Sequence, residues 1–111
     1  MVHLVEFFKK KFSHEMYQKD IEAVKMEQNP KKLADFACNN VFSNVRLEAI
    51  NRIDDEYVLR DVARSDSNRK VRMAAIGKIS DKSVLEDISK NDPNRLVRSF
   101  AENRLIEFGW K

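Results

Sequence analysis

The strongest constraint on this chain is a segment that occurs three times at a fixed interval. Residues 45–53, 71–79 and 97–105 each begin with Val-Arg, carry Ala at the fifth position and a basic residue at the eighth, and end in Ile or Leu. Each copy begins 26 residues after the previous one. A fixed period of this size is typical of supersecondary units that stack, because one unit cannot bury its apolar face alone.

Each 26-residue unit predicts two short helices joined by a turn. In the last unit Ser80 or Asp81 is a suitable N-cap, and Pro93 ends the first helix because proline cannot occupy a helix interior. The second helix is predicted to begin at the Val of each repeated segment. Only two Gly and two Pro occur in 111 residues. The sequence therefore predicts an all-α protein of stacked helix pairs.

The period also divides the chain, which we expect to form one domain. The predicted repeats are 28–53, 54–79 and 80–105. Residues 1–27 are predicted to be degenerate capping helices, because a shift by 26 places Lys19 and Asp20 at the positions of the repeated Val-Arg. Residues 106–111 are predicted to be a C-terminal cap that folds back over the open end, with Gly109 suited to a left-handed helix stop.

A helical projection at 100° per residue separates a packed side of the second helix from an outward side. The periodic arginines lie at the edge of the packed side. We expect them to pair with the turn residues Asp66 and Asp92, or with helix-end carbonyls, and not to bind phosphate. These arginines are Arg46, Arg72 and Arg98.

The outward side carries the candidate contact residues for a partner protein. Leu47, Met73 and Phe100 are apolar groups at positions where solvent is expected, and such groups often mark a contact site. Asn51 and Asn103 would supply hydrogen bonds beside them. The alternative is that these apolar residues are structural, covered by curvature of the stack or by the N-terminal helix.

A uniformly basic row on the flank supports a second hypothesis, of nucleic-acid binding. This row consists of Arg52, Lys78 and Arg104, and residues 9–11 add three lysines. The net charge of +3 and a pI near 9.1 permit such binding without arguing for it. Phosphate binding through this row predicts an affinity that falls steadily with salt concentration.

The repeated pattern Asp-x-x-x-x-Val-Arg-x-x-Ala-x-x-x-Ile/Leu, best seen in residues 66–79 and 92–105, resembles HEAT-like repeats. The form is the short one named for phycobilin lyase subunits, and the resemblance covers residues 28–105. It implies a right-handed α-solenoid whose second helices line a concave surface that holds a partner. It also implies, as a further alternative, an accessory subunit of a lyase-type complex. The His-Glu pairs with which related hydroxylases bind iron occur here only once, at His14-Glu15.

Few residues suited to catalysis are present. Two His, one Cys and two Gly do not supply a nucleophile with its base, a metal site or a phosphate-binding loop. Cys38 is expected to be a small core or boundary residue. We therefore expect no enzyme activity, no cofactor and no metal. With neither a signal peptide nor an apolar run of about 20 residues, we expect a cytoplasmic monomer or weak homodimer that binds a protein and no membrane.

Overall fold

The chain is all-helical over residues 2–111, the part that the structure, a computed structural model, describes. Side chains are described for Lys10 and residues 14–111. The described residues form seven α-helices: α1 (Val2–Met26), α2 (Pro30–Asn39), α3 (Ser43–Ile50), α4 (Glu56–Ser65), α5 (Arg69–Ile76), α6 (Lys82–Asn91) and α7 (Arg95–Glu107).

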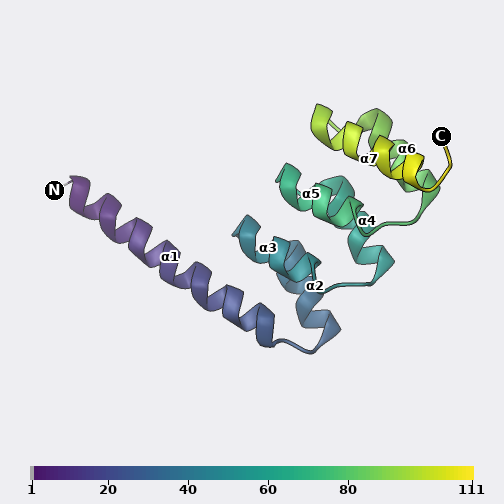
Figure 1. Cartoon of the computed structure of the whole chain (residues 1–111). Helices are drawn as coiled ribbons and strands as arrows, with labels where there is room; N and C mark the ends of the chain where they lie inside the picture. Colours follow the sequence, from purple (N-terminus) through teal and green to yellow (C-terminus); the bar gives the residue numbers. More distant parts are fainter. Residues whose placement is uncertain (1) are drawn as a thin grey trace.

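The helices after α1 pair in sequence order and the pairs lie in layers. Helix α2 packs on α3, α4 on α5 and α6 on α7, and the three pairs step away from α1 (Figure 1). Between layers, α3 packs on α5 and α5 on α7, whereas the first helices of successive layers touch less. The stack is therefore tighter on the side of the second helices.

The first helices begin at capping residues 26 positions apart. The side chains of Asn29, Asp55 and Asp81 accept hydrogen bonds from the first-turn amides of α2, α4 and α6. The N-cap expected at Ser80 or Asp81 is thus Asp81. The hydroxyl of Ser83 and the amide of Val84 donate to its carboxylate, and these bonds lower its pKa. A carboxylate at this position also suits the positive end of the helix dipole.

The core is continuous through the layers because each repeat contributes the same positions. A small Ala in each second helix is completely buried, which allows the first helix of that layer to approach closely. Valines one turn earlier are buried in the same way. The buried positions that recur are Val45, Val71 and Val97, Ala49, Ala75 and Ala101, and Ile50 and Ile76.

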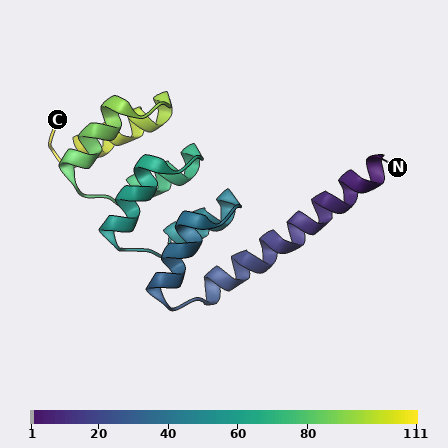
Figure 2. The ribbon, with the colours of Figure 1, turned by 180° about the vertical axis from the view of Figure 1, so that it is seen from behind.

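One helix takes the place of the capping helices predicted over residues 1–27. Helix α1 has 25 residues and is about 37 Å long, whereas the eight residues of α3 span about 12 Å. Its N-terminal half therefore runs beyond the helix pairs, as both views show (Figures 1 and 2). Near its other end Tyr17, Ile21 and the buried Val24 pack against the core. The sequence also predicts an amphipathic N-terminal half, and its apolar side chains lie outside the described ones: Leu4, Val5, Phe7, Phe8 and Phe12.

Helix α1 packs on α3 through a pair of side chains in which the hydrogen-bond donor and acceptor have changed places relative to the Arg–Asp pairs of the other layers. Asp20 occupies the position of the periodic arginines, and Asn40 occupies that of Asp66. The amide of Asn40 donates to the Asp20 carboxylate at 2.9 Å. The ring of Phe42 meets that of Tyr17 edge-on, with centroids 6.0 Å apart. Helix α1 therefore keeps the contact of a second helix although the sequence signature is lost.

Gly77 lies at the end of α5. It is the C-cap residue, with φ −62° and ψ −15°, a conformation open to any residue. A Cβ atom there would lie 3.8 Å from Cε1 of Phe100, an ordinary van der Waals distance. The glycine is therefore not required by the backbone, and the Phe100 ring packs beside it.

The C-terminal cap begins with the predicted left-handed residue. Gly109 has φ +76°, and the amides of Gly109 and Trp110 donate to the carbonyls of Ile106 and Leu105, the pattern of a Schellman motif. The chain then turns back, so that Lys111 Nζ lies 2.9 Å from a carboxylate oxygen of Glu102. Glu102 stands where inner repeats bury Ile, and at the open end its side chain is 40% exposed and pairs with Lys111.

Candidate functional site

The predicted partner-binding residues lie on the side of α3, α5 and α7 that faces away from the first helices. We call this surface the second-helix face. Leu47, Met73 and Phe100 are half-buried and pack against the core, so they are neither free in solvent nor enclosed. Asn51 and Asn103 are exposed beside them. These apolar groups therefore pack on the core and still present part of their surface, and their contact with a partner stays a prediction.

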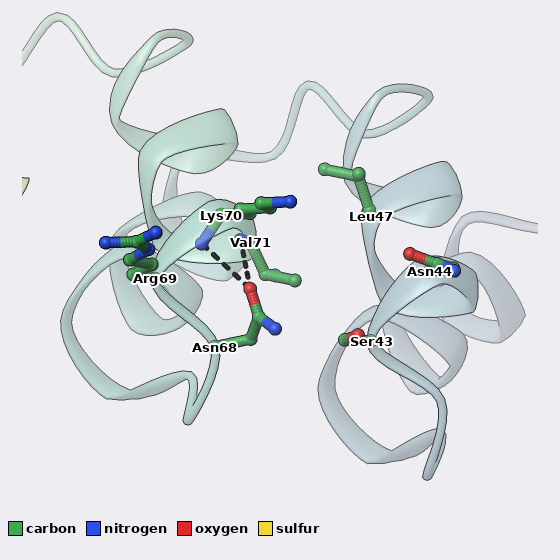
Figure 3. A pocket seen from close by; sticks show the side chains of 7 residues that line it. All are labelled: Ser43, Asn44, Leu47, Asn68, Arg69, Lys70 and Val71. Carbon is green, nitrogen blue, oxygen red and sulfur yellow. Dashed lines mark hydrogen bonds between the residues drawn. The ribbon is translucent and has the colours of Figure 1, made fainter.

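A shallow groove crosses the second-helix face between α3 and α5, with a volume of about 180 Å³. Figure 3 shows Leu47 and Lys70 directed toward each other across it. Asn68 forms part of its floor and is held there because its Oδ1 accepts the amides of Lys70 (2.8 Å) and Val71 (3.4 Å). Lys70 was not among the predicted contact residues, because it precedes the repeated segment 71–79.

A larger groove of about 480 Å³ lies between α2 and the start of α4. Leu33, Ala34, Ile53 and Val58 give it apolar walls, and Lys31, Arg52, Asp54 and Asp55 place charges of both signs around it. This groove could not be predicted from the sequence, because residues from two repeats form it. Apart from Arg52, it contains no predicted site residue.

The periodic arginines are structural, as predicted. The guanidinium of Arg46 donates to both carboxylate oxygens of Asp66, at 2.8 and 3.1 Å, and Arg72 does the same to Asp92, at 2.9 and 3.3 Å. Each pair joins one layer to the turn of the next. The third guanidinium nitrogen of each arginine donates to the carbonyl of residue 40 or 66 in the turn of its own layer.

The last arginine of the series has only half of this arrangement. Arg98 donates to the carbonyl of Asp92 at 2.7 Å, and among the described side chains no carboxylate pairs with it. Arg46, Arg72 and Asp92 are accordingly buried, whereas Arg98 is half-buried. A guanidinium that is already held by a carboxylate and a carbonyl has little left to offer a phosphate.

The basic row is also bound within the fold. Arg52 donates to the carbonyl of Val24, Lys78 to those of Ile50 (3.0 Å), Asn51 (3.3 Å) and Ile53, and Arg104 to that of Ile79 (3.1 Å). Each cation thus lies where the second helix of the preceding layer ends, a location favoured by the negative end of the helix dipole. All three side chains are half-buried.

Comparison with known proteins adds no relative. No match was found among models of protein families, curated proteins or solved structures. The family resemblance therefore rests on the repeated pattern alone.

Neither a membrane-spanning helix nor a cluster of metal ligands is found in the described part of the chain. Over residues 2–111 no helix combines the length and the apolar composition that crossing a bilayer requires. Among the side chains described, no three His, Cys, Asp or Glu gather as metal ligands.

Cys38 is not part of the core but lies at the surface of α2. It borders a small depression formed with Asp61, Val62, Ser65 and Asp66 of the next layer. Partial desolvation in this depression raises the pKa of the thiol, and the carboxylates of Asp61, Asp35 and Asp66 raise it further. A raised pKa leaves less thiolate at neutral pH, so the geometry makes Cys38 a weak nucleophile.

We predict that Cys38 in the native protein reacts several-fold more slowly with Ellman's reagent at pH 7.5 than in the urea-unfolded chain. The thiolate fraction is lower in the native protein, so the rate should rise with pH and approach the unfolded value above the raised pKa. An Asp61→Asn variant should react faster than the natural chain at pH 7.5. A native rate above the unfolded rate at this pH would contradict the electrostatic account.

Proposed function

We propose that this chain is a non-catalytic HEAT-like repeat protein that binds a partner protein through the second-helix face. In this proposal the layers form a right-handed α-solenoid, and the second-helix face is its concave side. Helix boundaries, caps and buried positions that recur every 26 residues support the repeat assignment. The tighter packing between second helices supports the assignment of the concave side.

The observation that carries the proposal is the composition of this face. Half-buried apolar side chains from α1, α3, α5 and α7 form a central stripe: Ile21, Leu47, Met73 and Phe100. Exposed polar groups, among them Asn44, Asn51, Lys70 and Asn103, stand around it. An apolar centre with a polar rim is the usual anatomy of a protein interface. The groove between Leu47 and Lys70 offers a first place for a side chain of the partner.

A catalytic role is not part of the proposal, because the buried charges are used by the fold. Arg46, Arg72 and Asp92 are buried in ion pairs between layers. We place the protein in the cytoplasm as part of the same proposal, since a reduced thiol at an exposed position suits that compartment.

Nucleic-acid binding is the weaker alternative. Its residues Arg52, Lys78 and Arg104 already donate to helix-end carbonyls and would have to exchange these partners for phosphates. In a titration with labelled single-stranded and duplex oligonucleotides we therefore expect no salt-dependent binding. Binding that falls with salt and that the Arg52→Gln variant weakens would contradict this expectation. The lyase-type accessory role rests on the family resemblance alone.

Affinity capture from cell extract tests the proposed face. An Asn51→Glu/Asn103→Glu bait should lose at least nine-tenths of a partner that the natural chain retains, because two carboxylates would be buried against the partner without compensation. A bait with Tyr57→Glu and Lys90→Glu, both exposed on first helices, is the matched control and should retain it. Equal loss from both baits, or loss from the control alone, would refute the assignment of the face.

A further inference from the structure

Helix α1 has the position of a second helix but no first helix beside it. In the other layers the residues at the positions of Lys19 and Ala23 are buried under α2, α4 or α6 and are at most 1% exposed. In α1 both Lys19 and Ala23 are exposed, because α1 packs mainly on α3 on its other side. Over residues 14–26, where the side chains are described, the surface of α1 that would receive a first helix is exposed.

This surface is apolar in sequence along the entire helix. At 100° per residue, positions 5, 8, 12, 16, 19, 23 and 26 fall within an arc of about 80°. They hold Val, Phe, Phe, Met, Lys, Ala and Met. Their centre lies roughly 150° from that of Tyr17, Ile21 and Val24, which contact the stack. Among the described side chains of this stripe, Met16 is 45% exposed and Met26 80%.

At the opposite end of the stack, the side of α7 that faces away from α5 is polar at two positions that face a neighbouring layer elsewhere. These positions hold Arg98 and Glu102, and the Glu102 side chain is 40% exposed and pairs with Lys111. A polar outer surface suits an exposed terminal repeat. Ile106, one turn beyond Glu102, is 53% exposed, but the apolar stripe of α1 is longer, since its positions run from 5 to 26.

We propose that this cover is α1 of a second copy of the chain, packed antiparallel to form a twofold-symmetric dimer. Positions 5 to 26 are separated by six steps that average 3.5 residues, the period of helices that pack along their length. The length of α1 that projects beyond the stack leaves room for a partner helix (Figure 2). This inference concerns a different surface from the second-helix face and does not depend on the proposed function.

The charges of α1 favour the antiparallel direction. Residues 2–13 contain three lysines and one acid, whereas residues 14–27 contain four acids and two lysines. Antiparallel pairing centred between residues 15 and 16 brings the basic half of each helix beside the acidic half of the other. The same register sets position 8 at the level of Ala23 and position 12 at the level of Lys19.

Sedimentation velocity over a range of concentrations tests the dimer. The natural chain should sediment as a dimer at tens of micromolar, and the Met16→Glu/Ala23→Glu variant as a monomer with unchanged helicity. Tyr57→Glu, which alters an exposed side chain away from the stripe, is the matched control and should remain a dimer. A monomeric natural chain, or a dimer that persists in the double variant, would overturn the proposal.

Disulfide trapping in a Cys38→Ser background tests the direction of pairing. Met16→Cys should cross-link two copies, because antiparallel pairing brings the two residues together near the twofold axis. Met26→Cys should not, because its two copies would lie about 30 Å apart, whereas a disulfide needs Cα atoms within about 7 Å. Cross-linking at both positions would indicate a parallel dimer and refute the register. A monomer that floats with anionic lipid vesicles would instead assign the stripe to a membrane surface.

Discussion

Replacing Asp92 with alanine is expected to lower the free energy of unfolding by about 3–5 kcal/mol, because it leaves a buried guanidinium without its carboxylate. The side chains of Arg72 and Asp92 are 9% and 3% exposed, and two hydrogen bonds join them. Asp92 Oδ1 also accepts the amide of Asn94 at 2.8 Å, so the turn before α7 would lose a bond as well. Urea denaturation followed by circular dichroism measures the loss.

The chain supplies its own control for this prediction. Arg98 occupies the same position as Arg72 but makes no carboxylate contact, so Arg98→Ala should cost only about 1 kcal/mol. In addition, the Arg72→Asp/Asp92→Asn double variant copies the natural Asp20–Asn40 pair and should be more stable than Arg72→Asp alone. A cost below about 1 kcal/mol for Asp92→Ala would show that the pairs between layers do not stabilise the stack.

Replacing Ile76 with glutamate is expected to destabilise the protein by more than about 4 kcal/mol, which is most of the stability of a typical domain. Ile76 is completely buried in the core, where an unpaired carboxylate is costly. The variant should lose its cooperative thermal unfolding transition and most of its helical circular dichroism signal.

The matched change at the open end should be nearly harmless. Glu102 occupies the position of Ile76 in the last layer, where it is half-buried and pairs with Lys111. Glu102→Ile should therefore change the free energy of unfolding by less than about 1 kcal/mol, since it removes only a surface ion pair. Similar costs for the two substitutions would mean that α7 is covered as α5 is, and the layer assignment would be wrong.

Features that repeat with the 26-residue period could be predicted from the sequence. The helical class, the N-cap at Asp81, the left-handed Gly109 and the arginine pairs with Asp66 and Asp92 all depend on residues near in sequence or one period apart. Periodicity fixes which residues face the neighbouring layer, so these contacts follow without knowledge of the complete fold.

Features that depend on the space between layers could not be predicted. The helical projection placed Leu47, Met73 and Phe100 in solvent, but neighbouring second helices approach closely enough to half-bury them. Met73→Asp or Phe100→Asp would consequently disturb the core. The exposed Asn51 and Asn103 are therefore better positions at which to test binding. The hydrogen bonds of the basic row could not be predicted, because the carbonyls that it contacts lie 25 to 28 residues earlier in the chain.

Capping helices were predicted over residues 1–27, but one continuous helix packed on α3 was not. Its sequence has lost the repeated signature, and only the structure shows that Asp20 and Asn40 keep the contact with their roles exchanged. Its length, from Val2 to Met26, also exceeds anything that the repeat requires.

Site-specific photo-crosslinking in cells tests most directly whether the second-helix face holds a partner. A benzophenone amino acid would be introduced singly at Asn51 and Asn103, and at the exposed first-helix positions Asp61 and Lys90. The account predicts that one and the same protein is cross-linked from Asn51 and from Asn103, and from neither of the first-helix positions. Cross-links to that protein from Asp61 and Lys90, with none from Asn51 and Asn103, would contradict it.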